Sequence, residues 1–462
     1  MKKNVRLRGS LSNALVFLPF SIISFFYLLA GSVLAQNILQ QPGSTLTPCG
    51  HFSSIFLRPQ DISYSDPSPT HITLMTSRWS DLQISAAGYE KTGVRLVGWD
   101  GSRLVPTEFK DDSGFDYFVP QLTSLFRLSL VQGADFFIGG MIVFCYSLGA
   151  LGLLLVLQGR WLKAWAMFEL VLLALLGVYV GDVYVVQSSI AILIIPWVLY
   201  FSRNWQSGLQ SPFFLAVGVA LGVANFVRAH AGTVVLLFCL PLLAFYGKTS
   251  VKRRVLLMAS LLAGTTTATL YFRHAFVVRD AYIQNHQSGY LPPAPHQHPV
   301  WHSIYIGLGF VSNPYVPGGY CDQVGLNEVQ AVSPSTDFFS PAYDRILGQQ
   351  VYQLAKNHPY VLVSNVAAKL GILQLIVLLA GNIGWLAVRY RKPLSLDAAF
   401  LAAAGFGVLP GLLTMPVPKY VVGGITVLVV YGLVSLNHMF QEGGVRGLSG
   451  LLSFLTKAAS LV

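Results

Sequence analysis

The chain has 462 residues, of which 53% are hydrophobic and only 11% are charged, against about 25% charged in an average soluble protein. So few charges cannot cover a water-facing surface of this size, which excludes a soluble enzyme, a coiled coil and a disordered chain and predicts a bilayer protein. The net charge of +11 comes from basic clusters in short breaks between apolar runs, a positive-inside pattern that requires no nucleic-acid partner.

The first apolar run, 11–35, ends in Val33-Leu34-Ala35, which resembles a signal-peptidase site. Its length favours a retained transmembrane anchor over a cleaved signal peptide. With the N-terminus in the cytoplasm, either interpretation places residues 36–133 outside as a first extracytoplasmic loop.

That loop contains two local patterns. Residues from Tyr89 to Val105 alternate loosely and reach an Asp100-Gly101 pair, which predicts a hairpin. Further on, Asp116 is the expected N-cap of a short amphipathic helix on the membrane surface. The apolar stripe of that helix is Phe118, Leu122, Leu125 and Phe126.

The remaining apolar runs bring the predicted number of crossings to ten and return the C-terminus to the cytoplasm. Residues 134–272 hold crossings 2–7, 273–369 form a second extracytoplasmic loop, 370–438 hold crossings 8–10, and 439–462 form a cytoplasmic tail. The predicted fold class is therefore a polytopic α-helical membrane protein in the plasma (inner) membrane. Its two long loops are expected to form a mixed α/β cap.

The second loop should hold a helix that begins at Ser340-Pro341, an N-cap followed by proline, and ends at His358-Pro359. The His-, Pro- and Gly-rich stretch 286–322 predicts rigid irregular structure instead.

Only Cys49 and Cys321 fall in the external loops, so we expect a disulfide between them. Cys145 and Cys239 lie within crossings and should be buried free thiols.

Three acids are candidates for chemistry. Asp111 and Asp112 precede the predicted surface helix, where a carboxylate stays ionised and could remove a proton from a hydroxyl. Asp182 lies in the external turn between crossings three and four, where a charge near the membrane is costly. Solvated loop acids and a water-facing turn are the plainer alternatives.

Basic residues supply the second group of candidates. Arg228 and His230 follow the fifth crossing on the external side, where positive-inside logic would exclude arginine, so we expect an anion such as a lipid phosphate. Contact with ordinary headgroups is the alternative. His298 and His302 flank Trp301 in a loop suited to packing on a sugar or lipid, and no metal-ligand pattern accompanies them.

These parts resemble the GT-C superfamily of membrane glycosyltransferases, near its protein O-mannosyltransferase and aminoarabinose-transferase branch. The resemblance rests on the Asp-Asp-x-Gly-x-Asp-Tyr stretch at 111–117, the second acidic turn at Asp182, the glycines of crossing five before Arg228, and Pro416-Val417-Pro418-Lys419-Tyr420.

The resemblance implies a role for each matching residue. Asp111 or Asp112 matches the catalytic acid of the first loop, Asp182 the second acidic position, and Arg228 a ligand of the lipid phosphate. The remaining implied substrate-binding residues are Asp116, Tyr117, Lys419 and Tyr420. Lys419-Tyr420 stands where many relatives have Arg-Tyr.

The implied reaction transfers a sugar, with inversion, from a polyprenyl-phosphate donor to a glycan, lipid or protein acceptor outside the cytoplasm. Membrane lipids are partners, no cofactor is required by the sequence, and a divalent cation stays open because the superfamily contains both kinds of enzyme. The alternatives are an O-antigen-ligase-like transferase, a transporter or an assembly scaffold.

Overall fold

The computed structural model describes residues 76–107, 112–202, 208–245, 250–293, 300–317, 322–387 and 392–442. The chain divides into two compact units. The larger comprises Arg58–His298, Ala380–Leu409 and Pro418–Val462, and the smaller comprises Met1–Leu57, Pro299–Leu379 and Pro410–Val417. The predicted first crossing at 11–35 and the Cys49–Cys321 disulfide lie outside the described residues.

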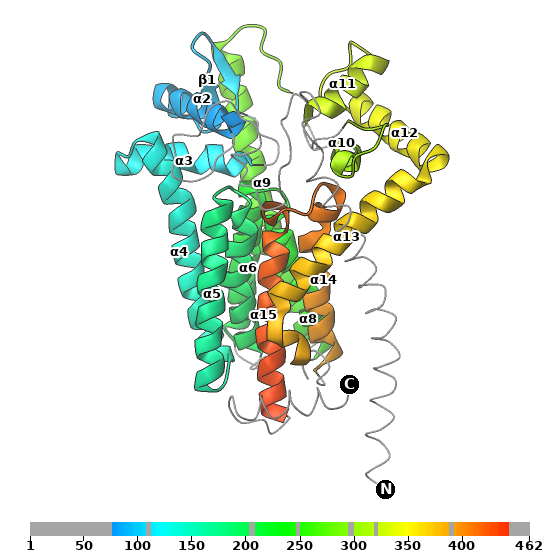
Figure 1. The fold of residues 1–462 in the computed structure, drawn as a ribbon. Helices are drawn as coiled ribbons and strands as arrows, with labels where there is room; N and C mark the ends of the chain where they lie inside the picture. The colour runs from blue at the N-terminus through cyan, green and yellow to red at the C-terminus, as the bar shows by residue number, and fades with distance from the viewer. Residues whose placement is uncertain are drawn as a thin grey trace. The chain divides into compact units, whose positions relative to one another are not determined.

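The larger unit holds most of the helices (Figure 1). Its elements are α2 (Thr76–Thr92), β1 (Val97–Trp99), β2 (Leu104–Pro106), α3 (Ser113–Phe126), α4 (Leu130–Val156), α5 (Arg160–Val180), α6 (Val185–Ser202), α7 (Gln210–Val227), α8 (Ala231–Phe245), α9 (Val251–His286), η3 (Asn382–Ala387), α14 (Leu394–Leu413, its last turn in the smaller unit) and α15 (Pro418–Glu442).

Eight helices among the described residues are long and apolar enough to cross a membrane: α4, α5, α6, α7, α9, α13, α14 and α15. The helix α8, with 15 residues, is shorter. Each of these nine helices overlaps a predicted crossing, so the assignment of this chain to the polytopic helical membrane proteins is confirmed at that level.

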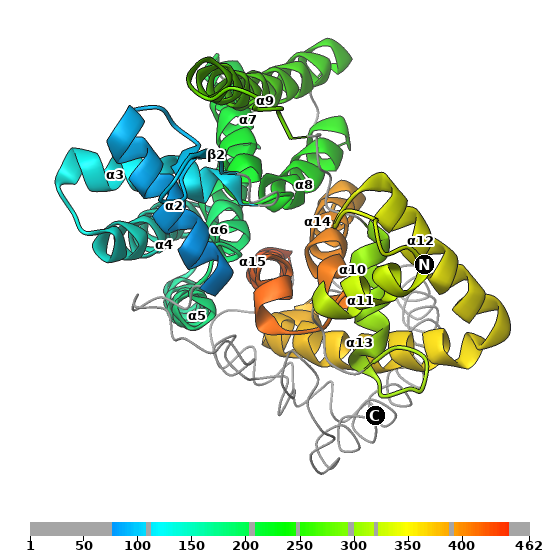
Figure 2. The same cartoon turned by 90° about the horizontal axis from the view of Figure 1, so that it is seen from above.

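Helix α6 occupies the centre of the larger unit. It packs against α4, α15, α8 and α7, and the view from above shows it among them (Figure 2). Within this interior, Ser188 bonds the Tyr146 hydroxyl at 2.5 Å and the Thr426 hydroxyl at 2.6 Å. Since hydrocarbon supplies no water, these hydroxyls satisfy one another and join α4, α6 and α15.

Glycines allow α7 and α9 to approach closely. A Cβ on Gly218 would come within 2.1 Å of the Leu261 carbonyl oxygen, and one on Gly264 within 2.2 Å of the Leu215 carbonyl oxygen. This is the small-residue packing common between membrane helices. The glycines of crossing five therefore have a packing role.

The segment 76–126 differs in two respects from the prediction and agrees with it in one. Tyr89 belongs to α2, so the predicted alternation begins too early. The hairpin itself is confirmed, with Val97 paired to Pro106 in an antiparallel register. The predicted N-cap Asp116 is wrong: Asp112 is the N-cap of α3, and Asp116 is a buried residue of its first turn.

The second half of the predicted α3 stripe faces outward, since Leu125 is 74% exposed and Phe126 is 54% exposed. Exposed apolar side chains beside the start of α4 suit a helix end at a membrane surface. Within the described residues the only strands are those of the hairpin, so the expected mixed α/β cap is helical apart from this hairpin.

The smaller unit contains α10 (Val300–Gly307), η2 (Leu308–Phe310), α11 (Asp322–Val332), α12 (Pro341–Asn357) and α13 (Pro359–Gly381). The start of α12 confirms the sequence signal, because the Ser340 hydroxyl caps the Tyr343 N–H at 3.2 Å. The prediction of irregular structure over 286–322 is wrong at α10, whose apolar residues pack on α12.

Two helices extend into the segment 273–369, the predicted second loop. Helix α9 continues to His286, well past residue 272, and α13 begins at Pro359 instead of about 370. Cys145 and Cys239 are buried free thiols, as expected.

Candidate functional site

Arg78 is the centre of a buried ion network in the larger unit. Its Nε donates to Asp112 Oδ2 at 2.5 Å, and its Nη1 donates to Asp182 Oδ1 at 3.0 Å and Oδ2 at 2.8 Å. Arg228 Nη1 donates to Asp112 Oδ1 at 2.8 Å. We call these four residues the Arg78 network. The side chains of Asp112 and Asp182 are at most 2% exposed, so the guanidinium groups supply the compensation that water would supply elsewhere.

The backbone of α3 and α7 positions two members of this network. Asp112 is the N-cap of α3, and Arg228 is the C-cap of α7. Gly114 lies against the end of α7, where a Cβ would come within 2.5 Å of Val227 Cα. The absence of a side chain at Gly114 therefore lets the start of α3 reach the end of α7.

The turn between α5 and α6 positions Asp182. Helix α5 ends at Gly181 in the left-handed conformation, with φ of 54°. The Asp182 side chain then accepts the Val183 N–H at 2.6 Å, and its carbonyl accepts the Val185 N–H at 2.9 Å. Side-chain capping of this kind is typical of aspartate at turns.

Two tyrosines and a lysine flank the network. The Tyr184 ring lies 4.1 Å from Arg228 Cζ, 5.3 Å from Lys419 Nζ and 5.4 Å from Arg78 Cζ. Tyr420 packs edge-on against Tyr184 with ring centroids 5.1 Å apart. One ring thus faces three cations from α2, α7 and α15, an arrangement that cation–π attraction favours.

The protonation states follow from burial and charge. Burial alone would raise the pKa of Asp112, but Arg228 and Arg78 outweigh it and hold this pKa below its ordinary value. Burial would likewise lower the pKa of Arg78, which Asp112 and Asp182 instead keep well above its ordinary range.

Asp116 behaves in the opposite way. Burial first, and then the nearby charges of Asp81 and Asp112, raise the pKa of Asp116 well above its usual value. Its buried position therefore favours the protonated form of Asp116. Three cations, Arg78, Arg228 and Lys419, thus lie around Tyr184 beside the carboxylates of Asp112 and Asp182.

The structure thus brings Asp112, Asp182 and Arg228 together and places Lys419 and Tyr420 beside them. Tyr117 points elsewhere: its hydroxyl bonds Arg95, and burial raises its pKa to about 12. His230 is exposed, with its ring edge-on to Phe406. Asp111 and His298 lie outside the described residues.

Sequence reasoning missed Arg78 and assigned no role to Tyr184. The buried residues of α2 are Arg78, Leu82, Ser85 and Gly88, spaced at helical intervals. Because this stripe is largely polar, hydrophobic periodicity gives no signal for it. The spacing of four, three and three residues is visible only once Arg78 and Ser85 are known to be buried.

His302 belongs to a different cluster, in the smaller unit. Its Nδ1 lies 2.7 Å from the Tyr343 hydroxyl and its Nε2 lies 3.1 Å from Asp322 Oδ1. The side chain is 1% exposed and packs against the ring of Phe339. We call His302, Tyr343 and Asp322 the His302 cluster. Both ring nitrogens are engaged, which favours a structural role over the predicted contact with substrate.

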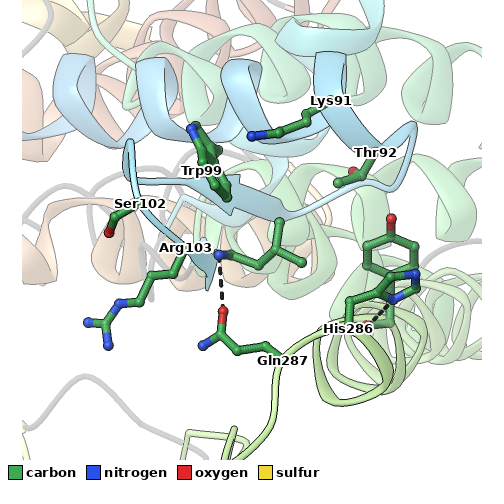
Figure 3. Close-up of a pocket in the computed structure, with 9 residues that line it drawn as sticks. Lys91, Thr92, Trp99, Ser102, Arg103, His286 and Gln287 are labelled. Atoms are coloured by element: carbon green, nitrogen blue, oxygen red, sulfur yellow. Dashed lines mark hydrogen bonds between the residues drawn. The ribbon is translucent and has the colours of Figure 1, made fainter.

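A surface pocket lies in another part of the larger unit, with a volume of about 480 Å³ (Figure 3). Its lining combines α2, the hairpin and the end of α9. The lining residues are Lys91, Thr92, Trp99, Ser102, Arg103, Leu104, Tyr282, His286 and Gln287.

The described carboxylates do not suit a divalent cation. No group of three or more His, Cys, Asp or Glu side chains that could hold a metal occurs in the part of the chain that the structure describes. Both oxygens of Asp112 accept from guanidinium groups, and a metal would have to displace them.

Comparison with known proteins gives one structural match. No protein-family model matches the sequence and no curated protein does either. The chain is similar to the crystal structure of ArnT from Cupriavidus metallidurans in the apo state, with 12% sequence identity over 78% of this chain and 72% of that one. The TM-score of 0.32 is too low for this likeness to carry an argument.

Proposed function

We propose that this protein is a membrane glycosyltransferase that moves a sugar from a polyprenyl-phosphate donor to an acceptor outside the cytoplasm. One observation carries the proposal. Asp112, Asp182 and Arg228, separated by up to 116 residues, meet Arg78 in one buried ion network, with Lys419 beside it on the same tyrosine ring as Arg228. Several arginine and lysine side chains gathered at the ends of membrane helices suit the phosphate of a lipid carrier.

The side of the membrane is inferred from the helix ends. The network lies where α5 and α7 end and where α6 and α15 begin. The opposite ends of these and neighbouring helices carry the basic residues Arg160, Lys163, Lys252, Arg253, Arg254 and Lys392. Because basic loops favour the cytoplasm, we assign the network to the extracytoplasmic face.

We assign a different role to each group of side chains in and beside the network, on the basis of its contacts. Arg228 and Lys419 face Tyr184 from α7 and α15, and we assign the donor phosphate to them. Asp112 and Asp182 hold Arg78 in place. A carboxylate whose two oxygens both accept from guanidinium groups is a poor proton acceptor, so we assign the general base to Asp111, the neighbouring acid.

The proposed step is a single displacement. Asp111 takes the proton of the acceptor hydroxyl as that oxygen forms a bond to the anomeric carbon. The bond between the anomeric carbon and the phosphate oxygen breaks at the same time, and its electron pair leaves with the polyprenyl phosphate. Arg228 and Lys419 stabilise this developing charge, while the base contributes about 10²–10⁴-fold.

The proposal is tested with purified protein in nanodiscs. A radiolabelled polyprenyl-phosphate sugar is supplied with envelope glycolipids as acceptors, and both the labelled product and free polyprenyl phosphate are measured. We expect the two to form in equal amounts. If a panel of hexosyl and pentosyl donors yields neither product, and lipid-linked intermediates do not accumulate in a deletion strain, the proposal is wrong.

A further inference from the structure

The pocket in Figure 3 lies beyond the hydrocarbon layer. Helix α9 has 36 residues and is about 54 Å long at 1.5 Å per residue, whereas the hydrocarbon is about 30 Å thick. If its basic N-terminal end lies at the cytoplasmic surface, as proposed above, the last turn projects roughly 20 Å past the opposite hydrocarbon boundary. A ligand at His286 and Gln287 is therefore in water and does not lie among lipid tails.

The pocket is also separate from the Arg78 network. Lys91 lies 13 residues after Arg78 on the same helix, α2, which corresponds to about 20 Å along its axis. Any ligand here is thus held at a distance from the network and not at the proposed reacting atoms.

The charges of the lining favour an anion. Lys91 Nζ lies 3.1 Å from the centroid of the Trp99 ring, and in the described part of the chain no carboxylate lies within ion-pair distance of it. Arg103 pairs with Asp100 at 3.3 Å while its side chain is 68% exposed, so this pairing is weak and can be exchanged for another anion. Figure 3 shows Lys91 directed toward Trp99 above the strands.

The remaining lining alternates rings with hydrogen-bonding groups. Gln287 uses its Oε1 to accept the Leu104 N–H at 3.1 Å, which leaves its two amide N–H donors for a ligand. The Tyr282 and His286 rings stack with centroids 4.1 Å apart. Flat rings beside fixed donors match a sugar, which presents apolar C–H faces and hydroxyl groups together.

We infer that this pocket binds an anionic carbohydrate and, resting on the proposed function, that it anchors a phosphorylated or carboxylated part of the acceptor glycan. Lys91 and Arg103 contact the anionic group, and Gln287 donates to a hydroxyl. The ligand is held by its distal sugar while another hydroxyl reaches the Arg78 network.

The test is direct binding to the full-length protein in nanodiscs, with N-acetylglucosamine 6-phosphate, N-acetylglucosamine and inorganic phosphate as separate probes. We expect the phosphorylated sugar to bind about tenfold or more tightly than either of the others, because each lacks one set of contacts. Lys91→Met and Arg103→Gln should each weaken binding about tenfold, and Ser102→Glu should abolish it by repulsion.

Matched controls lie on the exposed surface of α12, where Lys356→Met and Arg345→Gln remove the same charges and should leave binding unchanged. A melting temperature equal to the wild type excludes misfolding of each variant. Equal affinity for the neutral sugar or for phosphate alone, or unchanged binding by Lys91→Met and Arg103→Gln together, overturns the inference.

The outcomes separate this inference from the proposed function. Arg228→Ala should slow transfer more than tenfold and leave probe binding intact. Probe binding without any transferase activity leaves the pocket standing and removes the proposed function. Transfer to a phosphorylated acceptor without probe binding removes the pocket.

Discussion

The Arg78 network and the His302 cluster both bury ionisable side chains, but they neutralise them differently. In the smaller unit, His302 bonds a tyrosine hydroxyl and a carboxylate that is 67% exposed, inside a shell of aromatic rings. In the larger unit, Arg78, Arg228 and Lys419 lie beside Asp112 and Asp182, all of them largely buried. The first arrangement holds one histidine between two protein partners, whereas the second gathers three cations around one tyrosine ring, which we propose as the site of a ligand anion.

The largest expected effect comes from Arg78→Ala. This change leaves Asp112 and Asp182 buried without their shared guanidinium, which should cost about 3–5 kcal/mol of unfolding free energy and abolish transfer. Arg78→Lys keeps the charge but cannot bond both carboxylates in the same geometry, so it should recover stability in part and little activity. Thermal unfolding in detergent and the transfer assay measure the two effects, and wild-type melting of the alanine variant would contradict the buried network.

The same substitution should have different effects at the neighbouring residues Asp111 and Asp112. Asp111→Asn should lower kcat by about 10²–10⁴-fold, the usual contribution of a general base, with melting unchanged. Asp112→Asn should instead lower the melting temperature, because it removes a charge that Arg78 and Arg228 both need. Equal kinetic and thermal effects in the two variants would show that the division of roles is mistaken.

The smaller unit should respond in stability alone. Tyr343→Phe removes the hydroxyl beside His302 Nδ1 and leaves a buried ring nitrogen without this partner, at a cost of about 1–3 kcal/mol. Turnover per folded molecule should stay within about twofold of wild type, since the cluster is not assigned to the chemistry. A loss of kcat with normal melting would return His302 to the reacting site.

The smallest effect concerns pH. The unfolded chain releases the Asp116 proton above about pH 3.8, while the folded state, with its raised pKa, keeps it. Folded protein then binds more protons than unfolded protein, so stability falls as pH rises through this window. Asp116→Asn should remove this slope and stabilise the protein at pH 7. Asp112 gives the opposite pH dependence, because its pKa is lowered in the folded state: its contribution to stability is lost as the pH falls below about 3.8. Melting curves from pH 4 to 8 compare the variant with wild type.

The sequence predicts the parts of this molecule whose physical signal is local. Apolar runs locate the membrane helices, Ser340-Pro341 locates α12, and a charge beside an apolar run identifies Asp182 and Arg228. Each of these depends on neighbours in the chain.

Other features depend on contacts between distant segments. Arg78 is buried by Asp112 and Asp182, 34 and 104 residues away, in a polar stretch where no pattern predicts burial. Asp116 is displaced from the N-cap because Asp112, bonded to two arginines, begins the helix one turn earlier. Helix α10 forms in a Gly- and His-rich stretch because its apolar residues pack on α12. The burial of Arg78, the start of α3 and the formation of α10 all depend on tertiary packing, which hydrophobic periodicity in the sequence cannot predict.

The central claim is that Arg228 and Lys419, beside the Arg78 network, bind the phosphate of a lipid-linked donor. The most direct measurement is donor affinity and single-turnover rate for Arg228→Ala in nanodiscs, with the exposed Arg345→Ala as control. Loss of a buried guanidinium–phosphate contact should weaken donor binding at least tenfold and slow sugar release further, because the leaving phosphate loses the same partner. Wild-type affinity and release rate with a donor that the wild-type protein turns over would contradict the account.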